Sequence, residues 1–395
     1  MTNEVENVPE LRFPEFEYEW VQKKIDNLTT KIGSGKTPKG GSANYLSEGI
    51  PFFRSQNIQN GYLNLNDLVY IDSEIDESMK NSKSYFGDIL LNITGASIGR
   101  SAINTLSKTH ININQHVCII RLKKEFSFNF LGQFLLSPQG QKKIFKAQSG
   151  GSREGLNFKE IGSIKVNIPK NFNEQEKIGV FFSKLDRQIE LEEKKLELLE
   201  QQKRGYMQKL FSQDLRFKDE NENDYPDWEE TTLKNITNYI SSKKSSNQYN
   251  ESNNSEGYPV YDAIQEIGKD LQYDMKEPYI SILKDGAGVG RLNLRAGKSS
   301  VIGTMGYIQA NNVDIQFLYY RMKLLNFRKF IIGSTIPHLY YKDYSKEKIL
   351  IPTSNDEQKK IGHFILNKDK LINNKTLKLD YLKQRKQGLL QKMFI

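Results

Sequence analysis

Two glycine-rich segments contain residue types that bind phosphate in other proteins. Gly33-Ser34-Gly35-Lys36-Thr37 resembles the end of a P-loop, whose backbone N–H groups cradle a nucleotide phosphate. The full pattern needs glycine or alanine at position 30 and a helix after the threonine, but Thr30 and Pro38 stand there. We therefore predict a glycine-rich surface loop with two lysines. An enzyme that uses a nucleotide, such as an ATPase, stays open as an alternative on this segment alone.

The second segment is Gly286-Ala287-Gly288-Val289-Gly290, which follows an apolar run and invites comparison with a nucleotide or S-adenosylmethionine loop. Residues 291–295 alternate like a strand rather than a helix, so a tight turn between two strands fits better. A similar segment at residues 95–99 is also followed by an arginine, Arg100. Arg100 and Arg291 can present a cation to DNA or form structural salt bridges, and both interpretations stay open.

Residues suited to catalysis or metal binding are scattered. The histidines His110, His116, His338 and His363 do not have the spacing of metal ligands. The single cysteine, Cys118, excludes a disulfide framework and a cysteine-cluster metal site. We therefore predict a protein that is not an enzyme and carries no cofactor or metal of its own.

Basic and polar side chains alternate with aromatic ones in several segments, as in residues 52–57, 149–157 and 338–342. Arginine and asparagine read base edges through paired hydrogen bonds, and lysine neutralises phosphate. A solvated loop is the alternative for each segment. The candidate DNA-binding residues are Lys36, Lys39, Arg54, Asn57, Arg100, Arg153, Lys243, Lys284, Arg291 and His338.

Length and charge limit the class of protein. A chain of 395 residues predicts two or three domains, and its net charge of +9 suits a polyanionic partner. No apolar run approaches the roughly 18 residues that span a bilayer, and the first residues do not resemble a signal peptide. We expect a soluble, cytoplasmic protein that does not bind a membrane.

The chain repeats itself. A shift of 183 residues aligns residues 168–211 with 351–394 without a gap, and 19 of these 44 positions are identical. The pair of glycine turns and the pair of segments Leu11-Arg12-Phe13…Trp20 and Leu215-Arg216-Phe217…Trp228 repeat in the same order. The protein is therefore a tandem duplication.

The best-matched segments have the spacing of long helices. Apolar residues recur at steps of three, four and seven, with Glu192, Lys203, Lys375 and Lys386 on the same stripe. We predict N-caps at Asn173 and Asp356, and antiparallel packing of Ile189, Leu196 and Leu199 against Ile372, Leu379 and Leu382. Packing of each helix on its own domain is the alternative.

The remaining segments predict mixed α/β domains. Residues 85–93, 117–122 and 277–283 are typical of buried strands, and 126–136 and 315–325 of short helices. Residues 241–257, rich in serine, asparagine and lysine, predict an exposed loop.

These repeated motifs resemble the specificity subunit of type I restriction–modification enzymes over nearly the whole chain. The resemblance rests mainly on one motif that occurs in both halves, Ile-Pro followed by Glu-Gln-x-Lys-Ile-Gly and a long helix. The resemblance implies an α+β fold with two tandem mixed α/β target-recognition domains, joined by two long helices that pack as an antiparallel coiled coil with pseudo-symmetry. The implied segments are a first recognition domain at 1–170, a central helical spacer at 171–213, a second recognition domain at 214–353 and a C-terminal helical spacer at 354–395.

The resemblance also implies a non-catalytic function. Each domain would read half of a bipartite site in double-stranded DNA. Two modification (methyltransferase) subunits would methylate adenine, and the restriction (nuclease/translocase) subunits would cut the DNA. S-adenosylmethionine, ATP and Mg would belong to those partners. A free-standing DNA-binding regulator is the rival. The expected subunit interface comprises Glu174, Gln175, Ile178, Leu185, Ile189, Leu196, Leu199, Glu357, Gln358, Ile361, Ile372, Leu379 and Leu382.

Overall fold

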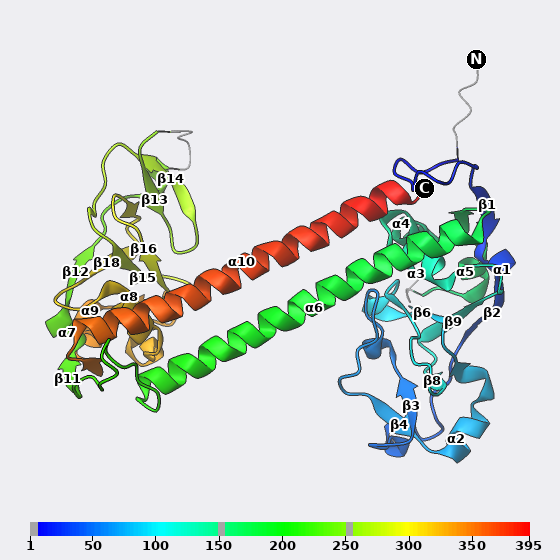
Figure 1. Ribbon diagram of the computed structural model, residues 1–395, viewed down its shortest axis with the longest axis horizontal. Helices are drawn as coiled ribbons and strands as arrows, with labels where there is room; N and C mark the ends of the chain where they lie inside the picture. Colours follow the sequence, from blue (N-terminus) through cyan, green and yellow to red (C-terminus); the bar gives the residue numbers. More distant parts are fainter. Residues whose placement is uncertain (1–6, 149–154, 250–255) are drawn as a thin grey trace. The chain divides into compact units, whose positions relative to one another are not determined.

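The computed structural model describes residues 7–148, 155–249 and 256–395. Its contacts divide the chain into two compact units. The first unit is Met1–Lys194 with Leu377–Ile395, and the second is Lys195–Thr376. Both long helices, α6 (Phe172–Phe211) and α10 (Asn355–Met393), are therefore shared between the units. Figure 1 shows α6 in green and α10 in orange to red.

The first unit contains two four-stranded sheets and one strand pair. The inner sheet has the order β2 (Thr29–Ser34), β9 (Val117–Leu122), β6 (Ile89–Asn92) and β7 (Ser101–Ile103). The outer sheet has the order β4 (Val69–Ile71), β3 (Ile50–Phe53), β8 (Ile111–Ile113) and β5 (Lys83–Ser84). The pair joins β1 (Val21–Lys24) to β10 (Lys165–Ile168). The helices besides α6 and α10 are α1 (Ile25–Leu28), α2 (Ser73–Ser78), α3 (Phe128–Leu136), α4 (Pro138–Ala147) and α5 (Phe158–Ser163).

The inner sheet of the first unit is buried on both faces. Ile89 and Leu91 belong to the core under the helices, whereas Leu90 belongs to the core shared with the outer sheet. Burial on both faces explains why β6 and β9 are continuous apolar runs without alternation. The strand predicted at 117–122 is confirmed, and the one predicted at 85–93 is shorter because residues 85–88 form a turn.

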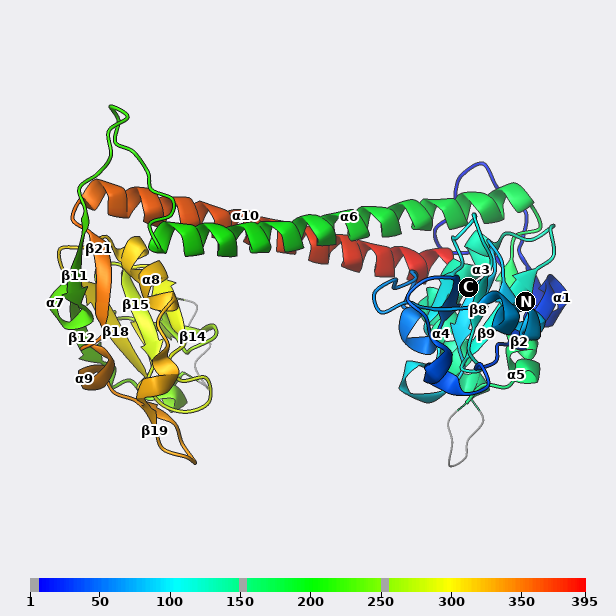
Figure 2. The same cartoon turned by 90° about the horizontal axis from the view of Figure 1, so that it is seen from below.

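The second unit repeats this plan. Its inner sheet has the order β12 (Thr237–Ser241), β18 (Met305–Ala310), β15 (Tyr279–Leu283) and β16 (Leu292–Arg295), with α8 (Ile315–Lys323) packed against it. The outer sheet has the order β14 (Glu266–Asp270), β13 (Tyr258–Tyr261) and β17 (Ser300–Val301). Two strand pairs complete it: β11 (Trp228–Thr232) with β21 (Lys348–Pro352), and β19 (Ile331–Ile332) with β20 (His338–Leu339) (Figure 2). The short helices are α7 (Leu233–Ile236) and α9 (Tyr341–Tyr344).

Several local predictions hold in the second unit. The strand expected at 277–283 and the helix expected at 315–325 are β15 and α8, and the turn between β15 and β16 confirms two antiparallel strands around residues 286–290. The loop expected at 241–257 lies partly outside the described residues. Within it Tyr249 is buried rather than exposed, because it belongs to the core of the outer sheet.

The long helices begin earlier than predicted. Asn171 Oδ1 accepts a hydrogen bond from the N–H of Asn173 at 2.8 Å, and the Ser354 hydroxyl accepts one from the N–H of Glu357 at 3.4 Å. Asn171 and Ser354 therefore cap the helices, two residues before the predicted caps Asn173 and Asp356. Asn173 and Asp356 lie in the first turn instead, beside the positive end of the helix dipole.

The two long helices pack antiparallel within each unit. In the first unit Asp186 pairs with Lys386 at 2.5 Å and Glu192 with Lys378 at 2.8 Å, so residue numbers rise along one helix and fall along the other. In the second unit Tyr206 lies edge-on to Phe364, with ring centroids 5.1 Å apart. The charged residues on the stripe, such as the buried Glu192, therefore form ion pairs along the helix seam. The predicted antiparallel packing is confirmed.

Among the described residues, no helix combines the length and the apolar character needed to cross a membrane.

Candidate nucleic-acid interface

The residue that precedes each glycine turn contacts a histidine ring. In the first unit, the hydroxyl oxygen of Thr94 lies 2.6 Å from Nδ1 of His116. In the second unit, Oδ1 of Asp285 lies 2.7 Å from Nδ1 of His338. Thr94 and Asp285 are equivalent in the repeat because Gly95 and Gly286 follow them. Each unit therefore places an imidazole beside its turn, although His116 precedes β9 and His338 belongs to β20.

The second unit collects two predicted DNA-binding residues around one carboxylate. The Lys284 ammonium lies 2.5 Å from Oδ2 of Asp285, opposite the oxygen that faces His338. Burial alone would raise the pKa of Asp285, but the hydrogen bonds from Lys284 and His338 outweigh it and lower that pKa. Because Asp285 contacts Nδ1, the Nε2 of His338 faces away from that carboxylate. Asp285 links the two candidates but is a residue that the motif search did not select.

A polar cluster occupies the corresponding place in the first unit. Gln115 lies 3.2 Å from His116, between their side-chain Nε2 atoms, and its Oε1 accepts a hydrogen bond from the Thr37 hydroxyl. Lys36 precedes Thr37 and is exposed. The loop after β2, the loop before β9 and the glycine turn therefore meet at His116, and the loop lysines lie next to this cluster.

The other exposed candidates extend from loops and turns. Arg100 follows the first glycine turn and donates to Gln59 Oε1 at 3.3 Å. Lys39, Lys243 and Arg291 are exposed. Arg153 lies outside the described residues.

Asn57 and Arg54 are not free for DNA. The Asn57 side chain is fully buried; its Oδ1 accepts from the Arg54 N–H at 3.0 Å and its amide donates to the carbonyl of Asn64 at 3.1 Å. Arg54 donates to the carbonyl of Asp67 at 2.8 Å. The prediction that Asn57 reads a base is therefore wrong, because its amide closes a loop of the outer sheet. Arg54 is half-buried and also serves that loop.

The Glu-Gln pairs expected at a subunit interface are buried inside their own units. Both oxygens of Glu174 accept from Arg12, at 2.7 and 2.9 Å, and Glu357 accepts from Arg216 in the same way, at 3.0 and 2.9 Å. Gln175 and Gln358 each donate to the carbonyl of the preceding proline, Pro169 or Pro352, at 2.8 Å. Their oxygens accept from the backbone N–H groups of Ser127 and Asp314, which precede α3 and α8.

These four residues are therefore corrected from interface to internal positions, where they join each recognition domain to its long helix. The apolar residues of the expected interface also face the protein interior to varying degrees. Ile178, Leu185, Ile361, Leu379 and Leu382 are buried, whereas Ile189, Leu196, Leu199 and Ile372 are half-buried. Their positions on the helix stripes make them packing residues of the two units.

An aspartate at equivalent positions connects three elements in each unit. In the first unit, Asp186 of α6 accepts from Gln133 of α3 at 2.8 Å and pairs with Lys386 of α10. In the second unit, Asp369 of α10 accepts from Tyr320 of α8 at 2.7 Å and pairs with Lys203 of α6. A shift of 183 residues converts Asp186 into Asp369 and Lys203 into Lys386. Both junctions therefore fix a recognition domain on the helix pair.

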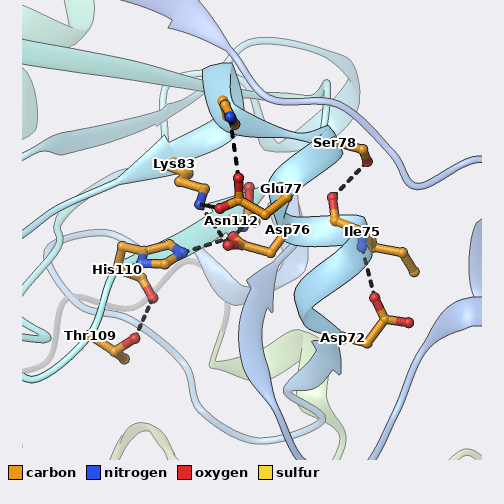
Figure 3. Close-up of polar contacts among 10 residues, drawn as sticks. Asp72, Ile75, Asp76, Glu77, Ser78, Lys83, Thr109, His110 and Asn112 are labelled. Atoms are coloured by element: carbon orange, nitrogen blue, oxygen red, sulfur yellow. Dashed lines mark hydrogen bonds and ion pairs between the residues drawn. The ribbon is translucent and has the colours of Figure 1, made fainter.

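A buried carboxylate in the first unit was not found from the sequence. Figure 3 shows Asp76 of α2 facing Lys83, His110 and Asn112. Lys83 Nζ lies 2.6 Å and His110 Nε2 lies 2.8 Å from its oxygens. Burial would raise the pKa of Asp76, but these partners lower it instead. The bonded groups are an ammonium, an imidazole and an amide, so the cluster joins α2 to β5 and β8.

The segments suspected of enzyme chemistry have structural roles. Gly33 and Ser34 belong to β2, so only residues 35–40 form the loop that we predicted for the whole segment. A Cβ at Gly35 would meet the Ile113 carbonyl, which accounts for that glycine. Burial raises the pKa of Cys118 to about 12, so its thiol is protonated at neutral pH. Within the described part of the chain, no three His, Cys, Asp or Glu residues are grouped to hold a metal ion.

Comparison with known proteins agrees with the family resemblance that the repeated motifs indicate. The chain is 24% identical over 413 residues to the putative type I restriction enzyme MjaX specificity subunit of Methanocaldococcus jannaschii, covering 98% of this chain and 95% of that protein. Over 136 residues it is 33% identical to the EcoBI specificity subunit of Escherichia coli, covering 34% of this chain and 28% of that one. A crystal structure of the type I restriction-modification system S subunit from M. genitalium has the same fold, with a TM-score of 0.71 at 20% identity, covering 98% and 99% of the two chains.

A family model described as the type I restriction modification DNA specificity domain matches residues 17–201 and again 225–384. The two matches correspond to the two copies of the duplication and together cover most of the chain. The chain therefore belongs to the type I restriction–modification specificity family and is a DNA-recognition subunit.

Proposed function

We propose that this chain reads a bipartite double-stranded DNA target, one half-site with each recognition domain. The observation that carries the proposal is the duplication of a complete unit, from the arginine that binds the buried glutamate to the glycine turn with its histidine. The side chains around the two histidines differ, since Thr94 and Gln115 contact His116, whereas Asp285, which also pairs with Lys284, contacts His338. Different side chains at equivalent places favour two half-sites of different sequence.

The proposed outcome of binding is adenine methylation and restriction by partner subunits in the cytoplasm. Two modification subunits would carry S-adenosylmethionine, and the restriction subunits would use ATP and Mg. This chain would contribute recognition and no catalytic group. The need for a methyltransferase partner distinguishes this proposal from the rival one, a free-standing DNA-binding regulator, which needs no methyltransferase.

Exchange of one recognition domain tests the proposal. Residues 1–170 are replaced by the matching domain of a relative, and the methylated sites are mapped in the DNA of cells that carry each version. We expect one half-site to change and the other to stay as it was, because each unit has its own core and its own glycine turn. An exchange that alters both half-sites contradicts divided reading, and a map that is unaffected by loss of the chain contradicts its role in methylation.

Equivalent apolar side chains support two copies of one partner. Tyr381 in the first unit and Leu198 in the second are both 62% exposed and differ by 183 positions, so they hold the same place in the repeat. Because the same place in both repeats carries an exposed large apolar side chain, we take the two positions as the contact for a protein partner. A pair of identical contacts suits two modification subunits.

A charge at either position is expected to remove one modification subunit. Leu198→Glu and Tyr381→Glu should each reduce the complex from two modification subunits to one, and the double variant to none, as measured by native mass spectrometry. Gln208→Glu and Gln391→Glu, at another exposed and equivalent pair, serve as matched controls. Unchanged stoichiometry in the double variant would place the partner elsewhere.

A further inference from the structure

A cleft in the second unit has an unusual lining. Its volume is about 400 Å³, and it lies between the glycine turn, the end of α8 and the segment that follows it. Three cationic side chains line it, Arg291, Lys323 and Arg328, together with the amide of Asn326. All other lining residues are apolar or glycine, so no carboxylate takes part in the lining.

The two arginines are held by their backbones while their guanidinium groups stay available. The Arg291 N–H donates to the Gly288 carbonyl at 3.2 Å and closes the glycine turn. The Arg328 N–H donates to Oδ1 of Asn326 at 3.2 Å, and the Arg328 carbonyl accepts from the N–H of Ile331. Both side chains are exposed. Within the described residues neither guanidinium is part of an ion pair, whereas the neighbouring Lys329 pairs with Glu347 at 2.6 Å.

Lys323 also lines the cleft and adds a third positive charge to it. Its ammonium lies 4.5 Å from the centroid of the Tyr319 ring, a cation–π contact that holds the side chain at the end of α8. The cleft thus combines three positive charges with an amide donor. A dianionic or monoanionic oxygen ligand satisfies such a set, and arginine binds phosphate oxygens in pairs.

The first unit fills the corresponding space. There Gln141 of α4 donates to the carbonyl of Gly99 at 3.1 Å, and a Cβ at Gly99 would meet the Gln141 oxygen at 3.0 Å. In the second unit Phe327, in the short 3-10 helix Phe327–Phe330, lies against Gly290 in place of that helix. The replacement of α4 by a shorter segment leaves room beside Arg291.

We propose that this cleft binds one phosphate of the DNA backbone next to the second half-site. The proposal rests on the proposed function, and it adds a phosphate-positioning site that only one of the two glycine turns provides among the described residues. The turn carries Lys284 and Asp285 at its start and Arg291 at its end. A phosphate held at the end of the turn would fix the register in which His338 and Lys284 meet the bases.

The test compares the salt dependence of DNA binding. The full chain and its Arg291→Gln/Arg328→Gln variant are titrated against a fluorescent duplex of unrelated sequence between about 50 and 200 mM salt, the range over which counterion release is resolved. Loss of one phosphate contact should reduce the slope of log K against log salt by about one, for any DNA sequence. Lys329→Gln is the matched control, since it removes a positive charge beside the cleft but not from its lining.

A second measurement separates DNA from free phosphate. Inorganic phosphate or ATP at millimolar concentration should not raise the thermal midpoint of the chain more than that of the double variant. Two results would overturn the assignment to DNA. One is a phosphate-induced rise in the thermal midpoint of the wild-type chain alone, with the same salt slope of DNA binding in the wild type and the double variant. The other is a double variant whose salt slope equals that of Lys329→Gln. A wild-type chain whose DNA binding shows no salt dependence at all contradicts the proposed function itself.

Discussion

Phe394→Ala is expected to destabilise the first unit by about 3–5 kcal/mol, the usual cost of removing a buried phenylalanine side chain. Phe394 is 1% exposed at the end of α10. Its ring centroid lies 5.2 Å from that of Phe130, 6.1 Å from that of Phe134 and 5.8 Å from that of Phe182. The core of the first unit is therefore completed by a residue from the second repeat.

The equivalent change in the second unit should cost less. Phe211 occupies the place of Phe394 in the repeat and lies 5.7 Å from Phe317, but it is only half-buried. A half-buried ring loses less transfer free energy on truncation and leaves a smaller cavity. We expect Phe211→Ala to destabilise the second unit by roughly half the cost of Phe394→Ala, on the same area argument.

The chain contains two tryptophans, one in each unit, so fluorescence can follow the units separately. Trp20 lies 5.6 Å from Phe130 and Trp228 lies 6.0 Å from Phe317, between ring centroids. Urea unfolding is measured in Trp228→Phe and Trp20→Phe backgrounds, each with and without the alanine change. Equal shifts of both transitions for Phe394→Ala would show that the two units unfold as one, contrary to this prediction.

The sequence predicted the repeated plan because the duplication left its helices and motif order nearly unchanged. Ile178 and Ile361 have the same neighbours, and Leu199 and Leu382 lie at the same spacing from them. A 3.6-residue period indicates a helix without reference to the rest of the fold. The sequence also predicted the strand β9, because a short apolar run rich in β-branched residues favours a buried strand.

Contacts between distant segments could not be predicted in the same way. Asp76 meets partners 7, 34 and 36 positions away, and no local pattern indicates that they converge. Asn57 has the residue type that reads bases, yet its amide satisfies backbone groups of its own loop. Glu174 and Gln175 stand in a repeated motif, but repetition does not distinguish a shared structural bond from a shared binding surface.

The candidate site also combines features that the sequence predicted with contacts that it did not predict. Exposure of Lys36, Arg100 and Arg291 followed from their positions in or after glycine-rich segments. The pairing of Asp285 with both Lys284 and His338 did not, because β20 reaches the turn only through the tertiary fold. A search for carboxylates directly before the glycine turn would have selected Asp285.

Glu174→Ala is the second change with a large expected effect, about 3–5 kcal/mol, because it leaves a guanidinium without its partner. The Glu174 side chain is 2% exposed, and Arg12 beside it is 13% exposed. Glu174 Oε1 also accepts from the indole N–H of Trp20 at 3.0 Å. Removal of the carboxylate therefore leaves two donors unsatisfied in the first unit.

The second unit provides the comparison that isolates the indole bond. Glu357 is equivalent to Glu174 and binds Arg216, but the indole N–H of Trp228 is buried and has no hydrogen-bond partner among the described residues. Glu357→Ala should therefore cost less than Glu174→Ala by about the net value of one hydrogen bond, roughly 0.5–1.5 kcal/mol, or up to about twice that when the acceptor is charged. Trp20 fluorescence should also shift in Glu174→Ala before unfolding, since its indole loses its acceptor.

A double-mutant cycle with Arg12→Ala checks the mechanism. If the carboxylate acts mainly through Arg12, the two changes together should cost less than the sum of the single changes, because the second removes a charge already left unpaired. Additive costs for Arg12 and Glu174 would mean that the glutamate stabilises the first unit through Trp20 and the helix N-terminus instead. In that case Glu357, which lacks the indole bond, should tolerate alanine far better than Glu174.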